Sequence, residues 1–210
     1  MWFIPGCAAL CLFVCLPLYL HYRPLKPVLA ACFKSMGTLC AMLPALIAAL
    51  RLNPVFWFFA AALFLHAAAD FLIDFRFEIG MGVFLLGHVC YLLAFLNLYP
   101  LTVAHLILLI CFLSAAAYLL YRCRSRLGKS LLPVAVYSVV LSLMAACGIA
   151  GGATSYSLRG IITALGAALF FFSDGMVFRG LLAPQSVRSD FFTMLLYYLA
   201  QLMLGFSCLL

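Results

Sequence analysis

The sequence predicts an all-α polytopic membrane protein in which about eight transmembrane helices form a single domain over residues 1–210. The first observation is composition: 69% of the residues are hydrophobic, 8% are charged, and the mean hydropathy is +1.27. A soluble domain of this size needs more polar residues to cover its surface. The second observation is spacing, because polar and proline breaks divide the chain into apolar stretches of roughly the 20 residues that cross a bilayer.

The first four spans are separated by short breaks that combine charge and proline. A loop from His21 to Pro27 ends the first span, and Pro27 suits the first turn of the next helix. Pro54 separates the second and third spans, and a charged turn from Arg76 to Glu78 follows the third. The N-terminal stretch lacks the basic segment and cleavage pattern of a signal peptide, so we interpret it as a retained span. The expected spans are 2–20, 28–50, 55–75 and 79–98.

The last four spans are delimited by proline, by glycine and by the longest polar loop. Pro100 separates the fourth and fifth spans, and the loop 122–130 follows the fifth. The stretch from Gly151 to Ser157 is rich in glycine and serine and predicts a turn. A loop over 179–190 precedes the last span. The expected spans are 101–121, 131–150, 160–178 and 191–210.

Basic residues are distributed unequally between the two ends of the predicted bundle. The positive-inside rule puts the loops after spans 1, 3, 5 and 7 in the cytoplasm and both termini on the non-cytoplasmic side. The formal net charge of +7 resides in these short loops, and no basic face with interleaved aromatic residues argues for nucleic acid. The opposite loops hold Arg51 and Arg159, whereas the odd-numbered loops hold Arg23, Lys26, Arg76, Arg122, Arg124, Arg126, Lys129, Arg179 and Arg188.

Two carboxylates interrupt the apolar spans. Asp174 follows Ser173 in span 7, and Asp70 lies late in span 3. An aspartate at the centre of a membrane helix costs about 2.5–3.5 kcal/mol, so such residues face a protein interior or a wet cavity. The helical rise puts Asp70 about 24 Å beyond Pro54 and Asp174 about 21 Å beyond Gly160. We expect both at similar depth, on one cavity open to the cytoplasm; the alternative is that each is a structural carboxylate.

Further polar side chains in the spans have both functional and structural interpretations. Lys34 is placed to bind a lipid phosphate or neutralise a carboxylate, or else to snorkel to the interface. His88 and Tyr91 share one face of a glycine-bearing helix, where interhelical packing explains them equally well. Tyr197 and Gln201 lie one turn apart in span 8.

Two residues flank Asp70 at one-turn spacing on the same helical face. We expect Asp74 to be solvated near the loop and paired with Arg76. His66 is either a partner of Asp70 or a packing residue. These side chains, with the second carboxylate, suit general acid–base chemistry.

The sequence contains none of the usual metal, nucleotide or serine-hydrolase motifs. There is no Walker A motif, HExxH, GxSxG or Cys/His ligand spacing. The ten cysteines include no CxxC pair and lie mostly in apolar runs, where Cys behaves as a small hydrophobe. We therefore predict no metal and no cofactor.

Six short sequence blocks combine the polar residues of the spans with small and aromatic neighbours. They are Phe33-Lys34, Ala69-Asp70-Phe71-Leu72, the run from Gly80 to His88 and Tyr91, Pro133 to Tyr137 with Met144-Ala145, Gly166 to Phe170 with Ser173-Asp174, and Tyr197-Tyr198 with Ala200-Gln201. Taken in order, these blocks resemble the YhhN-like lysoplasmalogenase family of eight-span membrane hydrolases. One departure is Ala69, which stands where the family has glycine before its first aspartate.

The resemblance implies hydrolysis of the vinyl-ether bond of lysoplasmalogens, a lysophospholipid substrate, to a fatty aldehyde and glycerophospho-ethanolamine or -choline. It implies catalysis by Asp70 and Asp174, one protonating the vinyl carbon and the other orienting water, as paired carboxylates do in glycosidases. Which aspartate is the acid stays open. Supporting roles follow for Lys34 at the phosphate and for the polar residues His88, Tyr91, Ser173, Tyr197 and Gln201.

Three other functions remain compatible with the pattern. A proton-coupled transporter would use the carboxylates as a relay, although no internal repeat is evident. An intramembrane aspartyl protease also needs two aspartates, but its Gly-x-Gly-Asp signature is absent. A non-catalytic lipid-binding relative is the third. As location we expect the bacterial cytoplasmic membrane rather than the endoplasmic reticulum.

Overall fold

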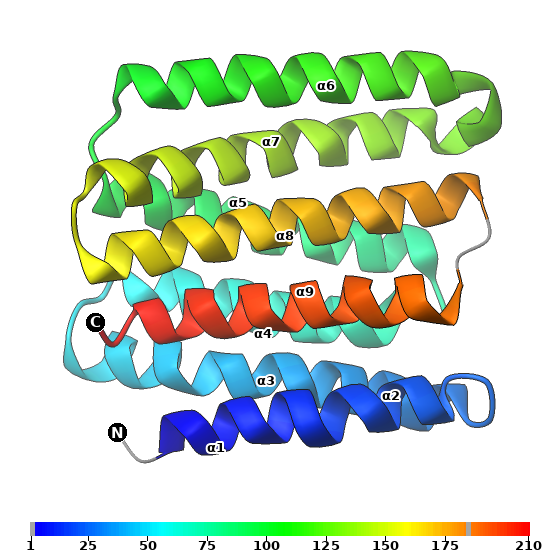
Figure 1. Ribbon diagram of the computed structural model, residues 1–210, viewed down its shortest axis with the longest axis horizontal. Helices are drawn as coiled ribbons and strands as arrows, with labels where there is room; N and C mark the ends of the chain where they lie inside the picture. The colour runs from blue at the N-terminus through cyan, green and yellow to red at the C-terminus, as the bar shows by residue number, and fades with distance from the viewer. Residues whose placement is uncertain (1–2, 184–185) are drawn as a thin grey trace.

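The computed structural model describes residues 3–183 and 186–210, and within these ranges the chain forms helices joined by short loops and no strands (Figure 1). The predicted all-α class is confirmed. The first residue of the expected span 1, Trp2, and residues 184–185 of the expected last loop lie outside the described residues. The elements are α1 (Phe3–Ala9), η1 (Leu10–Cys15), α2 (Leu16–Tyr22), α3 (Pro27–Arg51), α4 (Phe56–Leu72), α5 (Phe77–Leu98), α6 (Val103–Leu127), η2 (Gly128–Ser130), α7 (Leu131–Thr154), α8 (Leu158–Leu182) and α9 (Val187–Ser207).

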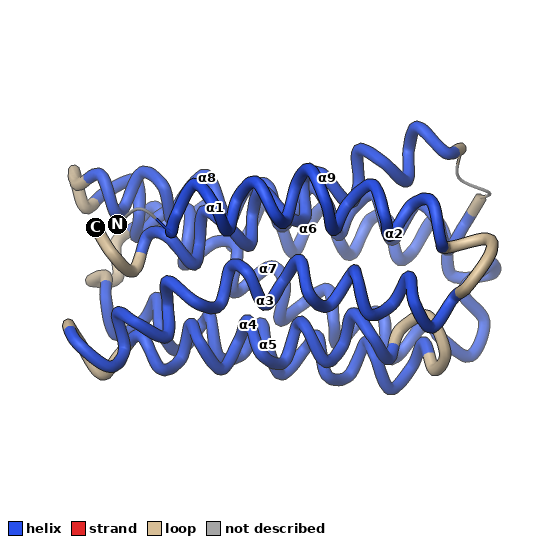
Figure 2. The backbone as a smooth tube through the Cα atoms, turned by 90° about the horizontal axis from the view of Figure 1, so that it is seen from below, coloured by secondary structure: helices blue, strands red, loops and turns tan. Residues whose placement is uncertain are grey.

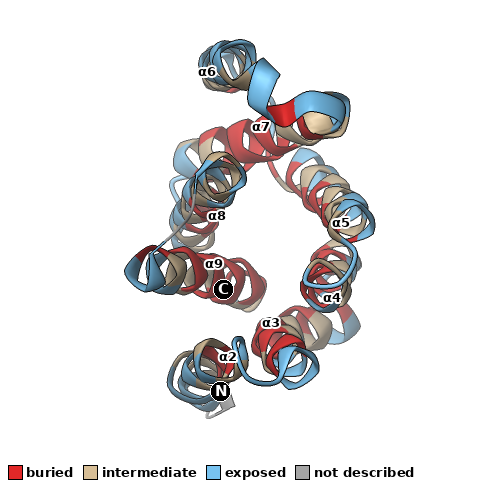
Figure 3. Cartoon of the chain, turned by 90° about the vertical axis from the view of Figure 1, so that its right-hand side faces the viewer, coloured by how far each residue is buried: buried red, intermediate tan, exposed pale blue. Residues whose placement is uncertain are grey.

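Six helices form a closed ring. Going round it, α3 packs against α4, α4 against α5, α5 against α7, α7 against α8, α8 against α9, and α9 back against α3 (Figure 3). The rod formed by α1, the π-helical η1 and α2 lies outside the ring against α3. Helix α6 lies outside it on the opposite side, against α7 and α8, and is the most exposed of the long helices.

The loops lie at the two ends of this bundle (Figure 2). Helices α2, α4, α6 and α8 finish at one end of the bundle, the right-hand end of Figure 1, and α1 begins near the point where α9 finishes, at the other end. Helices α4 and α8 therefore run in the same direction, as the sequence predicted. The shared end is the one that carries most of the basic loop residues.

Five helical stretches in the described residues are long and apolar enough to cross a membrane. One of them, Val103–Thr154, contains both α6 and α7, which fold back on each other (Figure 1). Helix α4 is apolar but shorter, with 17 residues. These helices support a membrane protein; the count of eight spans and the outside position of both termini stay predictions. The other four stretches are Ile4–Tyr22, Pro27–Arg51, Phe77–Leu98 and Leu158–Leu182.

Several helices extend beyond the predicted spans. Helix α6 continues through three arginines to Leu127, six residues past the expected end, because Arg is a good helix former and polarity alone does not end a helix. It ends at Gly128, whose φ of 52° is a conformation that other residues rarely adopt. Helix α8 likewise runs to Leu182, and α9 already begins at Val187.

The turn predicted from Gly151 was wrong over its first four residues, because α7 remains helical to Thr154. Gly151 and Gly152 serve close packing instead. A Cβ on Gly152 would overlap the backbone carbonyl of Gly160 in α8, so only glycine lets the two helices approach this closely. The glycines that predicted a turn therefore allow close contact between helices instead.

Candidate active site

A cavity of about 720 Å³ is lined mainly by residues of the ring helices, and Arg23, Asp74 and Asp190, which lie near the basic loops, also line it. Five of the eight predicted site residues line it: Lys34, Asp70, Ser173, Asp174 and Tyr197. The other three, His88, Tyr91 and Gln201, lie directly behind the wall and are fully buried. The expectation that these helices converge on one cavity agrees with this arrangement.

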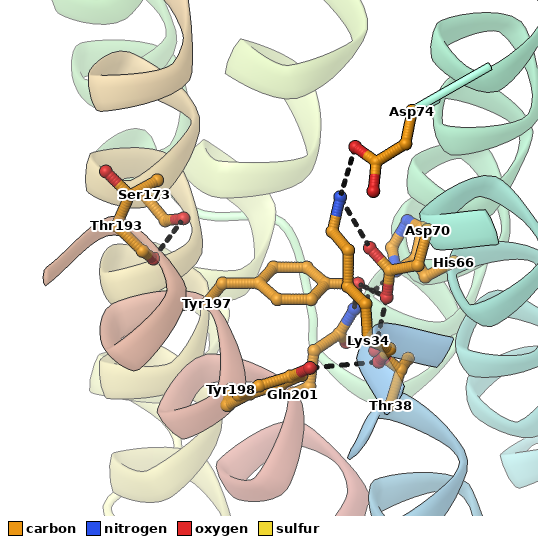
Figure 4. A network of polar contacts seen from close by, with 10 residues as sticks. All are labelled: Lys34, Thr38, His66, Asp70, Asp74, Ser173, Thr193, Tyr197, Tyr198 and Gln201. Carbon is orange, nitrogen blue, oxygen red and sulfur yellow. Dashed lines mark hydrogen bonds and ion pairs between the residues drawn. The ribbon is translucent and has the colours of Figure 1, made fainter. Parts of the chain in front are cut away.

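Asp70 is held by hydroxyl groups from two other helices (Figure 4). The Thr38 hydroxyl of α3 donates to Asp70 Oδ2 at 2.5 Å, and the Tyr197 hydroxyl of α9 donates to the same oxygen at 2.8 Å. Thr38 lies one helical turn after Lys34, so both face α4. The other oxygen, Oδ1, is buried and accepts no hydrogen bond from the described residues.

Lys34 lies between two carboxylates. Its Nζ is 3.7 Å from Asp70 Oδ1 and 3.9 Å from Asp74 Oδ1 (Figure 4). Asp74 follows Asp70 by one turn and pairs with Lys34 rather than with Arg76, the expected partner. The lysine is buried, which is costly for a cation unless carboxylates surround it. Lys34 therefore neutralises Asp70, one of the interpretations left open by the sequence.

Asp174 has its own partners on two further helices. The Tyr137 hydroxyl of α7 donates to Asp174 Oδ2 at 2.6 Å. His88 Nε2 of α5 is 2.8 Å from the Tyr137 hydroxyl and 3.3 Å from Asp174 Oδ2. The Asp174 side chain is 10% exposed, whereas that of Asp70 is fully buried.

A buried polar layer connects the two aspartates from behind. The Gln201 amide donates to the Tyr197 hydroxyl and to His66 Nδ1, each at 3.0 Å, and accepts from the Tyr91 hydroxyl at 2.9 Å. The rings of His66 and His88 have centroids 4.9 Å apart. This layer fixes Tyr197 on one side and His88 on the other, so the two carboxylates are held by one continuous scaffold.

Ser173 is turned away from Asp174. Its hydroxyl donates to the backbone carbonyl of Thr193 in α9 at 3.1 Å and joins α8 to α9 (Figure 4). Tyr91 contacts Gln201 and neither carboxylate. Among the residues given supporting roles from the sequence, His88 and Tyr197, besides Lys34, contact a carboxylate in the described part of the chain.

Tyr137 is the residue that sequence reasoning missed. It was noticed only as part of a family-like block, yet its hydroxyl makes the shortest contact to Asp174. The signal that could have found it was a tyrosine hydroxyl in the largely apolar predicted span 131–150. The contact of Thr38 with Asp70 was likewise not foreseen.

The two carboxylates share one pattern. In each, Oδ2 is anchored by a hydrogen bond donated by a tyrosine hydroxyl. Asp70 Oδ1 is buried and accepts no hydrogen bond from the described residues, and the Asp174 side chain is 10% exposed. An anchored carboxyl group with one oxygen left over can give or take a proton at a fixed position. Within the described residues, no three His, Cys, Asp or Glu side chains gather as a metal site.

A comparison with protein-family models matches residues 29–208 to the YhhN family. The chain belongs to the YhhN family. This is the family of lysoplasmalogenases that the six sequence blocks resemble, and membership is consistent with a hydrolase. Searches of curated proteins and of solved structures returned no match. The matched range includes every helix of the ring except the first residues of α3.

Proposed function

We propose that this protein is a membrane hydrolase that cleaves the vinyl-ether bond of lysoplasmalogens. The products are a fatty aldehyde and glycerophospho-ethanolamine or -choline. One observation carries the proposal: two aspartates from α4 and α8 line one cavity, and each has one oxygen anchored by a tyrosine hydroxyl. Membership of the YhhN family supports the same chemistry.

In the proposed reaction Asp174 is the acid. The attraction between Lys34 and Asp70 exists only while Asp70 is ionised, which favours Asp174 as the proton donor. Asp174 is also the more exposed to the cavity of the two. The proton moves from Asp174 to the β-carbon of the vinyl ether, the double bond supplies the electron pair, and an oxocarbenium ion results.

Water then adds to the α-carbon of that cation. Asp70 Oδ1, which has no hydrogen bond from a described residue, accepts one from the water and orients it, while the negative charge of Asp70 stabilises the cation. The proton lost by the water returns to Asp174. Asp174 then protonates the glycerol oxygen as the C–O bond of the hemiacetal breaks, and it regains the proton that the hemiacetal hydroxyl loses as the aldehyde forms. One water is consumed, and the aldehyde and a free hydroxyl are released.

Tyr137 and His88 position the proposed acid. The Tyr137 hydroxyl has one hydrogen, and its 2.6 Å contact directs that hydrogen to Asp174 Oδ2. The Tyr137 oxygen is then an acceptor for His88 Nε2 at 2.8 Å. These two hydrogen bonds fix the position of the Asp174 carboxyl group, and its Oδ1 is proposed to face the substrate. Lys34 lines the cavity and is proposed to approach the substrate phosphate as well.

The test is an aldehyde assay on purified protein in detergent. A lysoplasmalogen, the matching saturated alkyl-ether lysolipid and the matching ester lysolipid are incubated in parallel. We expect aldehyde from the vinyl ether alone, and none with Asp174→Asn, which is nearly isosteric and should fold.

Two results would overturn the proposal. One is near-normal aldehyde release by a folded Asp174→Asn variant, which would refute the two-aspartate mechanism. The other is no aldehyde from folded, monodisperse wild-type protein. Proton-coupled flux in liposomes would then be measured, because a transporter also uses intramembrane carboxylates.

A further inference from the structure

Helix α6 reaches the cavity although it lies outside the ring. It packs against α7 and α8, which are neighbours in the ring. Four of its residues nevertheless line the cavity: Ala115, Ala116, Leu119 and Leu120. A helix outside the ring lines the interior only where the wall is open, so the cavity must pass between α7 and α8 to reach α6.

This side branch of the cavity is apolar. The α6 residues that line it have no polar side-chain atom, and the helix satisfies its own backbone. Phe171 of α8 also lines the cavity, and its ring stacks on Phe112 of α6 with centroids 4.4 Å apart. Helices α6 and α8 run in the same direction and end near the basic loops (Figure 1). Phe112 precedes the cavity-lining residues of α6, and Phe171 precedes Asp174 in α8. The stack therefore lies on the side of these residues that is farther from the basic loops.

The polar edge of the branch is the proposed acid. Phe171 and Asp174 are three residues apart on α8, and Tyr137 and Leu141 are four apart on α7, so each pair shares a helical face. All four residues line the cavity. A molecule lying in the branch would thus place an apolar part against Phe171 and Leu141 and a reacting group beside Asp174 and Tyr137.

We propose that the branch between α7 and α8, covered by α6, binds the hydrocarbon chain of a single-chain lipid and is the side through which that chain enters from the bilayer. This rests on the proposed function for the identity of the lipid. Ala115 and Ala116 leave the room that the chain occupies. The Phe112–Phe171 stack closes the inner end and limits the chain length accepted.

The experiment uses adjacent alanines as a matched pair. Ala116 lines the cavity, whereas Ala117 is exposed and does not. Ala116→Phe and Ala117→Phe add the same side chain to the same helix, one into the branch and one outside it. Binding of alkyl-ether lysophosphatidylcholines, which lack the vinyl bond, is measured by thermal stabilisation of full-length protein with a short and a long chain.

We expect Ala116→Phe to weaken binding of the long-chain lipid about tenfold or more, because the added ring takes the space of the hydrocarbon chain and overpacking a filled site costs about that much. Binding of the short-chain lipid should change less than twofold, and Ala117→Phe should match wild type for both. Leu120→Ala, which enlarges the branch, should shift the preference to longer chains. Ala115→Leu is the milder blocking variant if Ala116→Phe does not fold.

The inference is overturned if Ala116→Phe and Ala117→Phe bind the long-chain lipid alike, or if Ala116→Phe weakens both lipids equally. These lipids need no cleavage, so the result is independent of the aldehyde assay. Loss of long-chain binding in a protein that releases no aldehyde would retain the hydrocarbon site and reject the hydrolase.

Discussion

The most informative substitution is Tyr137→Phe, because Tyr137 joins the proposed acid to His88. It removes one oxygen, which lies 2.6 Å from Asp174 Oδ2 and 2.8 Å from His88 Nε2, and keeps the ring. A hydrogen bond to a charged group contributes about 1.5–3 kcal/mol. If that bond positions Asp174 in the transition state, kcat should fall roughly 10- to 150-fold, at about 1.4 kcal/mol per factor of ten.

The assay is initial aldehyde release over a range of lysoplasmalogen concentrations, which separates kcat from KM. We expect KM to change little, because Tyr137 is proposed to hold the acid and not the head group. Tyr99→Phe is the matched control: the Tyr99 hydroxyl donates to Thr163 at 3.2 Å, and neither residue lines the cavity. A kcat within twofold of wild type in folded Tyr137→Phe, or an equal loss of kcat in both variants, would show that Tyr137 does not position Asp174.

Three further predictions concern support, stability and orientation. Ser173→Ala should keep kcat within twofold of wild type and lower the free energy of unfolding by about 1 kcal/mol, because the Ser173 hydroxyl donates its hydrogen bond to the Thr193 carbonyl. A large loss of kcat would instead give Ser173 a chemical role. Lys34→Ala should lower the free energy of unfolding by about 3–5 kcal/mol, because it leaves Asp70 buried without its cation, and it should also raise KM. The double variant Lys34→Met, Asp70→Asn should recover the lost stability, as measured by thermal unfolding. A thiol reagent that does not cross membranes should leave Ser125→Cys, in a background without reactive cysteines, unlabelled in intact bacterial cells; labelling would reverse the predicted orientation.

Much of the site was predictable because burial of charge in a membrane is so costly. Asp70 and Asp174 were conspicuous in apolar spans, and helical rise alone put them at similar depth. Lys34 was conspicuous for the same reason, and its pairing with Asp70 is one of the outcomes that the sequence allowed.

What was not predictable is which helix lies beside which. Hydropathy locates a span but says nothing of its neighbours, so the contact of α5 with α7 and of α3 with α9 had no signal. Tyr137 was missed for this reason. Ser173 shows the complementary limit: consecutive residues on a helix point about 100° apart, so Ser173 faces α9 while Asp174 faces Tyr137.

The central claim is that Asp174 delivers a proton to the vinyl carbon. It is tested most directly by running the reaction in heavy water and analysing the aldehyde by mass spectrometry, with preformed aldehyde as the control for exchange. We expect one deuterium on the carbon next to the aldehyde group with wild-type protein, and no product with Asp174→Asn. Aldehyde without that deuterium, or labelled aldehyde formed at the wild-type rate by Asp174→Asn, would contradict it.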